Sequence, residues 1–279
     1  MALFRALESA RHSDQLFVDP YAERFLPAGY RVAARAARLR LVGRLLERYI
    51  DSRWSGGPRG SAVVRTRLID DWVNAALADG AEQLLLLGAG FDSRAYRLPA
   101  LAGVDVFEVD HPATQATKQR RLAAQFDGGR RAHVRLVPVD LIRDDLDAAL
   151  TGAGFDRAVR TVVIWEGVTN YLTADAVDAT LRYLVSATPA GSQVVFTYID
   201  RAALEGSVTF EGLDAWRDAV TAGGEPWTFG FHPAELDGYL AARGLRLRSD
   251  LSARDAAQRY HRHEPTAAFY RIALAEVTA

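Results

Sequence analysis

The pattern of apolar and polar positions divides the chain into an N-terminal helical part and a longer part that alternates between strands and helices. From about residue 81 onward, short apolar runs alternate with amphipathic segments, which is typical of βαβ units around a largely parallel sheet. Thr173 precedes one of these segments, where its hydroxyl can cap a helix. The pattern predicts strands at residues 83–88, 104–109, 133–139, 161–165 and 192–198, and helices at residues 112–126, 144–150 and 173–187.

The two ends of the chain differ from this alternating middle. Residues 1–60 are helical in pattern and rich in Arg and Ala, and we expect them to form a cap that precedes a core at residues 61–279. After a short helix at 233–243, strands at 245–251 and 266–277 are expected to add to the sheet as a hairpin-like pair. Segments 201–230 and 253–265 are interpreted as insertions over the carboxyl edge of the strands, with a cap insertion at about 201–232.

The first predicted strand runs into a glycine turn, Gly88-Ala89-Gly90, and no third glycine follows at the spacing of a dinucleotide-binding loop. In an open α/β sheet the ligand lies beyond the carboxyl ends of the strands, where glycines let it approach the backbone. Asp92 follows the turn, and a carboxylate there would repel a diphosphate and attract a cation. The turn therefore disfavours an NAD-dependent oxidoreductase and favours a positively charged ligand.

Acidic residues at the ends of the next strands restrict the chemical class of the ligand further. Asp110 lies roughly 20 residues beyond the glycines, at the end of the second strand, where a carboxylate accepts hydrogen bonds from a ribose diol. Asp140 and Leu141 end the third strand, where they can receive the adenine amino group and pack on the ring, and Glu166 ends the fourth. A cationic nucleoside with a free ribose diol and no diphosphate describes S-adenosylmethionine (SAM).

The segment before the first strand adds an arginine to this set. Arg65 shares a helical stripe with Ile69 and Trp72, on the face that should pack inward. A buried guanidinium needs an anionic partner, and the methionine carboxylate of SAM is a suitable one. Arg67 lies off this stripe with Asp71 four residues later, so we expect it at the surface.

These residues occur in blocks that resemble the leucine carboxyl methyltransferase family, and more closely its bacterial branch that includes polyketide carboxyl O-methyltransferases. The resemblance implies a class I methyltransferase: a doubly wound, seven-stranded, mostly parallel α/β sheet with an antiparallel final hairpin and a helical cap. It also implies SAM contacts at Arg65, Gly88, Asp110, Asp140 with Leu141, and Glu166. The chain departs from the usual family pattern at Trp165 and at Asn170. The blocks, in chain order, are DPYAERFL, VVRTRLIDDWV, LLLLGAGFDSRAYRL, VFEVDHP, VPVDL and WEGVTNYL.

Composition excludes several classes of function. A formal net charge of -1 and a pI near 6.6 do not provide the clustered cations that a nucleic-acid binder needs. The chain has no cysteine, which excludes disulfides and thiol nucleophiles. We interpret the polar group of His261, His263 and Glu264 as solvent-facing rather than as metal ligands. Residues 1–10 have no apolar core, so we do not expect a secretory leader, and the sequence has no apolar run of bilayer length. We expect a cytoplasmic monomer or homodimer with a small-molecule substrate, and neither nucleic acid nor membrane as a partner.

The sequence offers no persuasive general base. His111 and His232 are the nearest candidates, but each precedes a proline where a helix is predicted to start, and capping explains such a residue as well. A carboxylate acceptor is already ionised at neutral pH, whereas a phenol or alcohol usually needs a base. We therefore expect SAM-dependent methylation of a natural-product-like carboxylic acid, with hydroxyl or phenol O-methylation and a non-catalytic SAM-fold binding protein as the alternatives.

Polar and aromatic side chains near the same edge are candidates for positioning the acceptor. Asn170 and Tyr171 follow the fourth predicted strand, and Tyr198 ends the fifth. Aromatic residues in the late insertion either line a pocket for a hydrophobic or aromatic acceptor or pack in the core, namely Trp216, Trp227, Phe229 and Phe231.

Overall fold

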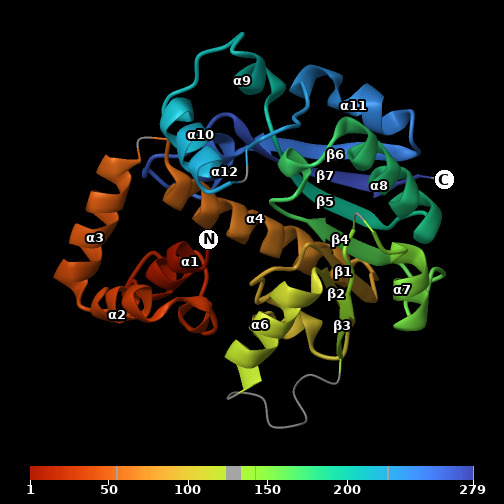
Figure 1. Ribbon diagram of the computed structural model, residues 1–279, viewed down its shortest axis with the longest axis horizontal. Helices are drawn as coiled ribbons and strands as arrows, with labels where there is room; N and C mark the ends of the chain where they lie inside the picture. The colour runs from red at the N-terminus through yellow and green to blue at the C-terminus, as the bar shows by residue number, and fades with distance from the viewer. Residues whose placement is uncertain (55, 124–132, 142, 225, 279) are drawn as a thin grey trace.

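In the computed structural model, which describes residues 1–54, 56–123, 133–141, 143–224 and 226–278, seven strands form one sheet in the order β3-β2-β1-β4-β5-β7-β6 (Figure 1). Neighbouring strands pair in parallel except at β7, which is antiparallel to both β5 and β6. The predicted fold class is confirmed, including the antiparallel final pair. The strands are β1 (Gln83–Leu87), β2 (Asp105–Asp110), β3 (Val134–Pro138), β4 (Thr161–Trp165), β5 (Gln193–Ile199), β6 (Leu245–Ser252) and β7 (Tyr270–Val277).

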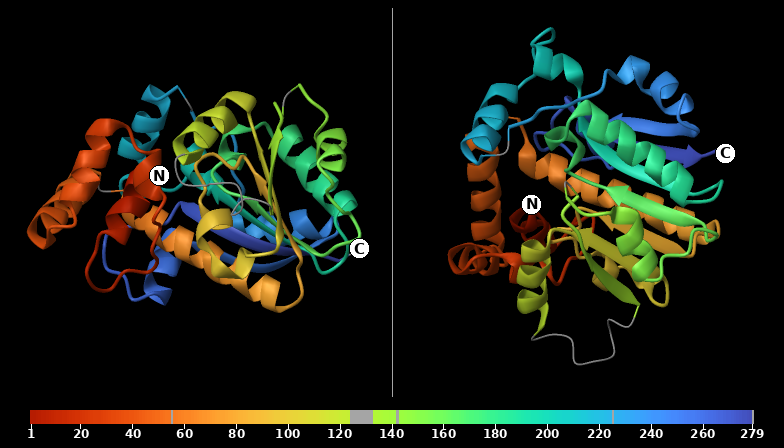
Figure 2. Two further views of the ribbon diagram at one scale, coloured as in Figure 1. Left: turned by 90° about the horizontal axis from the view of Figure 1, so that it is seen from below. Right: turned by 45° about the vertical axis from the view of Figure 1, so that its right-hand side comes forward.

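Helices cover both faces of the sheet, as the turned views in Figure 2 show. One face packs against α4 (Pro58–Ala78) and α12 (Ala253–Arg259), and the other against α7 (Leu146–Gly152), α8 (Ala174–Ala187) and α11 (Pro233–Ala241). Because both faces are covered, β1 is buried along its whole length, with Leu85 and Leu87 in one core cluster and Leu84 and Leu86 in the other. A continuous apolar run is therefore the signature of this central strand.

The predicted elements agree with the structure to within a few residues at most ends. Thr173 caps α8, since its side chain accepts a hydrogen bond from the Ala176 amide at 3.2 Å. The predicted helix at 112–126 is α6 (Pro112–Leu122), and residues 124–126 lie outside the described part of the chain. The last strand begins at Tyr270 rather than at residue 266, because the chain before it runs beside α4.

Residues 253–265, interpreted from the sequence as an insertion over the carboxyl edge of the strands, begin instead with a helix that packs on one face of the sheet. Ser252 and Asp255 form a capping box that starts α12 directly after β6. Ala253, Ala256 and Ala257 then pack against α4 and join the core on that face. Small alanines allow the close approach of the two helices, and α12 forms the connection between β6 and β7.

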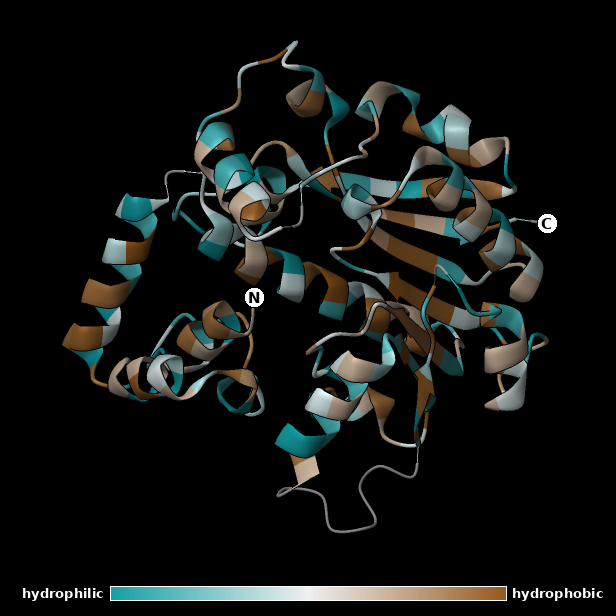
Figure 3. Ribbon diagram, in the orientation of Figure 1, coloured by the Kyte–Doolittle hydropathy of each residue, from teal (hydrophilic) through white to brown (hydrophobic). Residues whose placement is uncertain are grey.

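The N-terminal residues form a group of helices beside the sheet, drawn red to orange in Figure 1. Helix α1 packs against α4, where the buried Glu8 pairs with Arg262 at 2.8 Å. Helix α3 carries apolar side chains that the rest of the described chain leaves uncovered, since Leu41 and Tyr49 are 74% and 65% exposed. Figure 3 shows brown segments along this helix, away from the sheet. The group consists of α1 (Ala2–Ser9), η1 (Ala22–Phe25), α2 (Ala28–Ala36) and α3 (Arg40–Arg53).

An insertion with short helices separates β5 from α11. It contains α9 (Arg201–Glu205) and α10 (Leu213–Ala222), and Trp216 of α10 packs on Tyr270 at the start of β7. Short helices also follow β1, namely α5 (Arg94–Arg97) and η2 (Pro99–Leu101), and η4 (Thr169–Tyr171) follows β4. Among the helices described, none is long and apolar enough to cross a membrane.

Candidate active site

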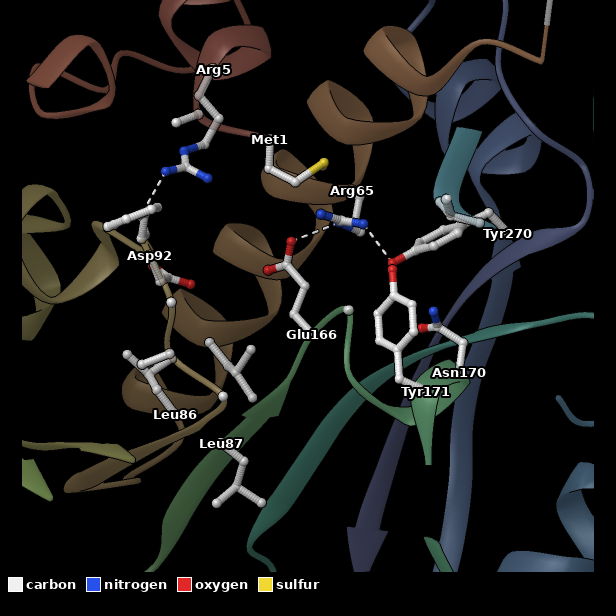
Figure 4. Close-up of a pocket in the computed structure, with 18 of the residues that line it drawn as sticks. Met1, Arg5, Arg65, Leu86, Leu87, Asp92, Glu166, Asn170, Tyr171 and Tyr270 are labelled. Carbon is white, nitrogen blue, oxygen red and sulfur yellow. Dashed lines mark hydrogen bonds and ion pairs between the residues drawn. The ribbon is translucent and has the colours of Figure 1, made fainter. Parts of the chain in front are cut away.

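A cavity of about 460 Å³ opens at the carboxyl ends of β1 and β4, which lie side by side in the sheet (Figure 4). The strand-end turns form its floor, and α1, α4 and α10 supply its walls. This is the position at which open α/β sheets bind ligands. The lining includes Met1, Ala2, Arg5, Arg65, Leu86, Leu87, Gly88, Ala89, Gly90, Phe91, Asp92, Ile164, Glu166, Gly167, Asn170, Tyr171, Trp216, Val220, Trp227 and Tyr270.

The glycine turn after β1 needs its glycines for two reasons. Gly88 has φ of +69°, and a Cβ there would lie 2.6 Å from Cγ2 of Val168. The amides of Gly88 and Ala89 both donate to the carbonyl of Val109, at 2.9 and 3.0 Å, which folds the turn back over β2. Backbone therefore faces the cavity with no side chain in between.

Asp110 is held against this turn. One carboxylate oxygen accepts a short hydrogen bond from the Gly90 amide, and the other accepts from the His111 amide at 2.6 Å. The carboxylate is thereby fixed at the end of β2, next to the glycine turn. It lies at the rim, outside the set of residues that line the cavity.

The centre of the wall is a buried network of alternating charges. Glu166 at the end of β4 pairs with Nε of Arg65 at 2.6 Å and with Nη1 of Arg94 at 2.7 Å. Arg94 also pairs with Asp92 and, at 2.8 Å, with Asp70. Burial raises the pKa of Glu166 and the two guanidinium groups lower it, so that the resulting pKa lies below its ordinary value. Glu166 is therefore an ionised group held between two cations.

This network corrects the electrostatic interpretation of Asp92. From the sequence, its carboxylate was expected to stand at the turn as a charge that attracts a cation. In the structure Arg94, two residues later, folds back onto it. Burial raises the pKa of Asp92, Arg94 lowers it, and the resulting pKa lies below the usual range. Asp92 is ionised but already paired, so it does not act on a ligand as an isolated negative charge.

Arg65 projects from α4 into the cavity, as Figure 4 shows. The residue is 6% exposed, and its Nη1 donates to the hydroxyl of Tyr270 at 2.5 Å. Arg67, by contrast, pairs with Asp71 at 2.9 Å on the outer side of the helix, as predicted. The helical stripe read from the sequence thus separates the two arginines correctly.

Arg5 is a lining residue that the sequence analysis did not identify. Its Nε donates to Asp19 at 2.8 Å and its Nη2 to the carbonyl of Phe91 at 2.6 Å, while Nη1 has no partner among the residues that the structure describes. Asp19 is itself buried and accepts from Ser93 of the glycine turn at 2.6 Å. These contacts join α1 to the turn and hold a guanidinium over the cavity.

Comparison with known proteins identifies the family. The profile described as leucine carboxyl methyltransferase matches residues 1–185 of the 279. The chain belongs to this family. It is 34% identical over 262 residues to a Frankia alni protein named "Putative S-adenosyl-L-methionine-dependent methyltransferase", across 94% of this chain and 85% of that one. A Mycobacterium sp. (strain JLS) protein of the same name is 35% identical, across 86% of this chain and 80% of the relative.

Solved structures share the fold. A crystal structure from Thermobifida fusca, titled as that of a "putative methyltransferase", superimposes with a TM-score of 0.60 at 15% identity, across 99% of this chain and 94% of that one. A DUF574 family protein from Streptomyces avermitilis gives a TM-score of 0.55 at 18% identity, across 98% and 99%. At such low identity the likeness concerns the architecture alone.

Two of the residues predicted to position an acceptor, Asn170 and Tyr171, lie on η4 and line the cavity. Tyr198 does not line the cavity, so the expectation that it positions the acceptor is wrong. It is fully buried, its hydroxyl donates to Asp250 at 2.7 Å, and burial, reinforced by Asp250, raises its pKa far above the usual range. Tyr198 shares its face of β5 with Phe196, in the core cluster on the opposite side from α4.

The two candidate bases also lie away from the cavity lining. His111 is the N-cap of α6, where its Nδ1 accepts from the Ala113 amide at 3.3 Å. His232 precedes α11, with its Nε2 3.4 Å from Glu205. Both placements match the capping or structural explanation rather than a place beside the reacting atoms.

The remaining predicted residues divide between the rim and the core. Asp140 and Leu141 follow β3, and Leu141 is 41% exposed at the outer rim. The four aromatics of the late insertion separate into two pairs: Trp216 and Trp227 line the cavity, while Phe229 and Phe231 are buried in the core. No group of metal-ligating side chains occurs in the described ranges.

Proposed function

We propose that this protein is a SAM-dependent O-methyltransferase that esterifies the carboxylate of a small-molecule acid. That the protein is a SAM-dependent methyltransferase follows from its family membership and from its 34% sequence identity to the Frankia alni relative across 94% of the chain. The choice of a carboxylate as acceptor is our inference from the site.

The residues around the cavity have the donors and acceptors that SAM requires. Arg65 and Arg5 offer guanidinium groups for its carboxylate, and Glu166 offers an acceptor for its ammonium group. The backbone of the Gly88-Ala89-Gly90 turn would lie against the methionine and ribose parts. In this proposal Asp110 binds the ribose diol, and Asp140 with Leu141 binds the adenine at the rim.

One observation favours a carboxylate as the methyl acceptor. Of the lining side chains described, none is His or Lys, and both carboxylates, Asp92 and Glu166, are paired with Arg94. The terminal amine of Met1 also lines the cavity, and burial, together with the charges of Arg5 and Arg65, lowers its pKa to about 6. This amine is the base that a hydroxyl acceptor would have to use. Burial raises the pKa of the lining Tyr270, which keeps this phenol neutral. A hydroxyl acceptor needs a group that removes its proton, whereas a carboxylate reacts as it stands.

The reaction is an in-line displacement in which the protein chiefly positions its reactants. Bound SAM supplies a methyl group activated by a sulfonium. The walls from α1 and α10 exclude water from the acceptor oxygen, which would otherwise be hydrated and less reactive. We also propose that the acceptor is natural-product-like and that the enzyme acts in the cytoplasm, as the sequence predicts.

The proposal is tested by incubating the protein with methyl-labelled SAM and a panel of carboxylic acids and phenols. We expect products that release labelled methanol in alkali, because methyl esters hydrolyse there and aryl ethers do not. Alkali-stable ethers as the sole products would overturn the carboxylate assignment and support hydroxyl methylation.

A matched pair of variants on α4 tests the cofactor assignment. Arg65→Met should weaken SAM binding about 10- to 100-fold, as expected for loss of a charge-assisted hydrogen bond. Arg67→Met removes an arginine from the outer side of the same helix and should leave the SAM affinity unchanged. Equal effects of the two substitutions would contradict the placement of the SAM carboxylate at Arg65.

A further inference from the structure

Asn170 occupies a fixed position in the wall of the cavity. The neighbouring Thr169 hydroxyl donates to the carbonyl of Thr197 at 2.5 Å, and the Thr228 amide donates to the Asn170 carbonyl at 2.8 Å. A hydrogen bond to β5 and another from the segment before α11 thus hold the backbone around Asn170. The Cα of Asn170 is thereby fixed at the cavity wall.

The side-chain amide oxygen of Asn170 is buried and has no protein partner in the described ranges. The residue is 2% exposed, and its Oδ1 accepts no hydrogen bond there. Leaving such a polar group unpaired costs about 1–3 kcal/mol, and native proteins pair the large majority of them. An amide in this state at a cavity wall is most simply explained by a ligand that completes its hydrogen bonds.

The surroundings of Asn170 define the shape of that ligand. Trp216 stacks on Tyr270 with ring centroids 5.8 Å apart and planes 5° apart, and Trp227 meets Trp216 edge-on at 6.1 Å. Figure 4 shows Asn170 next to Tyr171 and Tyr270 on the side of the cavity away from Arg5. The wall therefore joins one polar amide to a broad apolar surface, with Arg65 hydrogen-bonded to Tyr270 at its edge and Arg5 on the far side.

We propose that Asn170 binds the acceptor carboxylate, donating a side-chain N–H to the oxygen that does not attack the methyl group, while the acceptor's apolar body lies against Trp216. This inference rests on the proposed function and names how that site selects its substrate. The attacking oxygen forms a bond to the methyl carbon as the carbon–sulfur bond breaks, and the electron pair passes to sulfur. The sulfonium and carboxylate charges cancel, and no proton moves.

A neutral donor suits this task better than a cation would. A guanidinium paired with the acceptor would stabilise its negative charge in the ground state, and that stabilisation is lost as the ester forms. An amide N–H orients the carboxylate with a weaker hold on its charge. Because the O and N positions of an amide are interchangeable by rotation, Asn170 can present its nitrogen to the acceptor at little cost.

The test uses Asn170→Asp and Asn170→Ala, with benzoate, cinnamate, indole-3-acetate and octanoate as acceptors. Asn170→Asp keeps the shape but places a negative charge beside the acceptor, and kcat/KM at pH 8 should fall at least 100-fold. Asn170→Ala removes only the hydrogen bond, and kcat/KM should fall about 10- to 100-fold. SAM affinity should stay within twofold for both variants, which also shows that they fold.

A pH profile separates binding from a structural role. As pH falls toward about 5.5, the buried carboxylate introduced by Asn170→Asp takes up a proton and becomes a donor again, so the activity of this variant should partly recover. The wild-type protein should show no such rise. Asn74→Asp, at an exposed position on α4, is the matched control and should behave as wild type.

The outcomes are distinguishable. If the wild-type protein esterifies an acid of the panel but Asn170→Asp stays within threefold of it at pH 8, the role of Asn170 is refuted and the proposed function stands. Loss of SAM binding together with activity would also refute it, because the amide would then serve the cofactor or the fold. A wild-type protein that esterifies none of the four acids would contradict the proposed function and this inference together.

Discussion

The substitution Glu166→Gln tests the buried charge network directly. Glu166 bridges Arg65 and Arg94 at 2.6 and 2.7 Å, and all three side chains are at most 15% exposed. Glutamine keeps the size and one acceptor oxygen but removes the charge. Arg94 still has Asp70 as a partner, so the uncompensated charge falls on Arg65.

The magnitude follows from these contacts. Removing one partner of a buried ion pair costs about 3–5 kcal/mol, and the retained hydrogen bond places Glu166→Gln near about 3 kcal/mol. In a chain of this size each kcal/mol lowers Tm by roughly 2–4 °C, so a decrease of about 6–12 °C is expected. The SAM dissociation constant should rise about 10- to 100-fold, because the ammonium group loses its acceptor.

Urea unfolding and calorimetric titration with SAM measure these two effects separately. Glu205→Gln is the control, since Glu205 pairs with Arg201 on an exposed helix face and its loss should cost less than about 0.5 kcal/mol. If Glu166→Gln unfolds within 1 kcal/mol of wild type and binds SAM equally well, Glu166 neither holds Arg65 nor contacts the cofactor, and the reasoning fails.

Three further predictions concern titration, the glycine turn and the core. The pKa values of Asp92 and Glu166 lie below their usual values of 3.8 and 4.5, so their contribution to stability is present above about pH 4.5 and is lost as pH falls further. The lining Met1 amine has a pKa of about 6, so kcat/KM for an acid should be flat from about pH 7.5 to 9, where this amine is neutral, and a rise through a single pKa in that range would indicate a general base. Gly88→Ala places a side chain at a position with positive φ and against Val168, so it should lower the free energy of unfolding by about 1–2 kcal/mol and weaken SAM binding at least tenfold. An unchanged Tm and SAM affinity would show that the turn tolerates a side chain. Tyr198→Phe removes a buried hydrogen bond and should lower stability by about 1–2 kcal/mol with kcat/KM unchanged, whereas a large loss of kcat/KM in a stable variant would return Tyr198 to the active site.

The residues predicted best are those that follow a strand directly. Gly88 and Glu166 could be placed from the sequence because parallel strands bring their carboxyl ends to one edge, and β1 and β4 are neighbours in the doubly wound order. Arg65 was identified because helical periodicity placed it on the inward stripe of α4. Local patterns of this kind determine a position without knowledge of the remaining fold.

Residues brought in by distant packing were harder to predict. Arg5 reaches the cavity because α1 packs on α4 and because Asp19 and Phe91 hold its guanidinium. No local sequence pattern predicts these contacts between segments far apart in the chain. Tyr198 illustrates a signal that was present but not used. It shares parity with Phe196 on β5, and side chains two residues apart on a strand face the same side of the sheet.

The role of charge in this site also had to be learned from the structure. The sequence showed acids at one edge and thereby indicated a cationic ligand, but Asp92, Glu166 and Asp70 are matched by Arg65, Arg94 and Arg97. Recognition of SAM must then come from where each donor and acceptor stands rather than from a surplus of negative charge. SAM itself carries a net positive charge at neutral pH, so its binding to a balanced site makes the site cationic. An anionic acceptor is attracted to that charge, and methyl transfer removes it, which gives the ester and the neutral thioether no electrostatic reason to remain together.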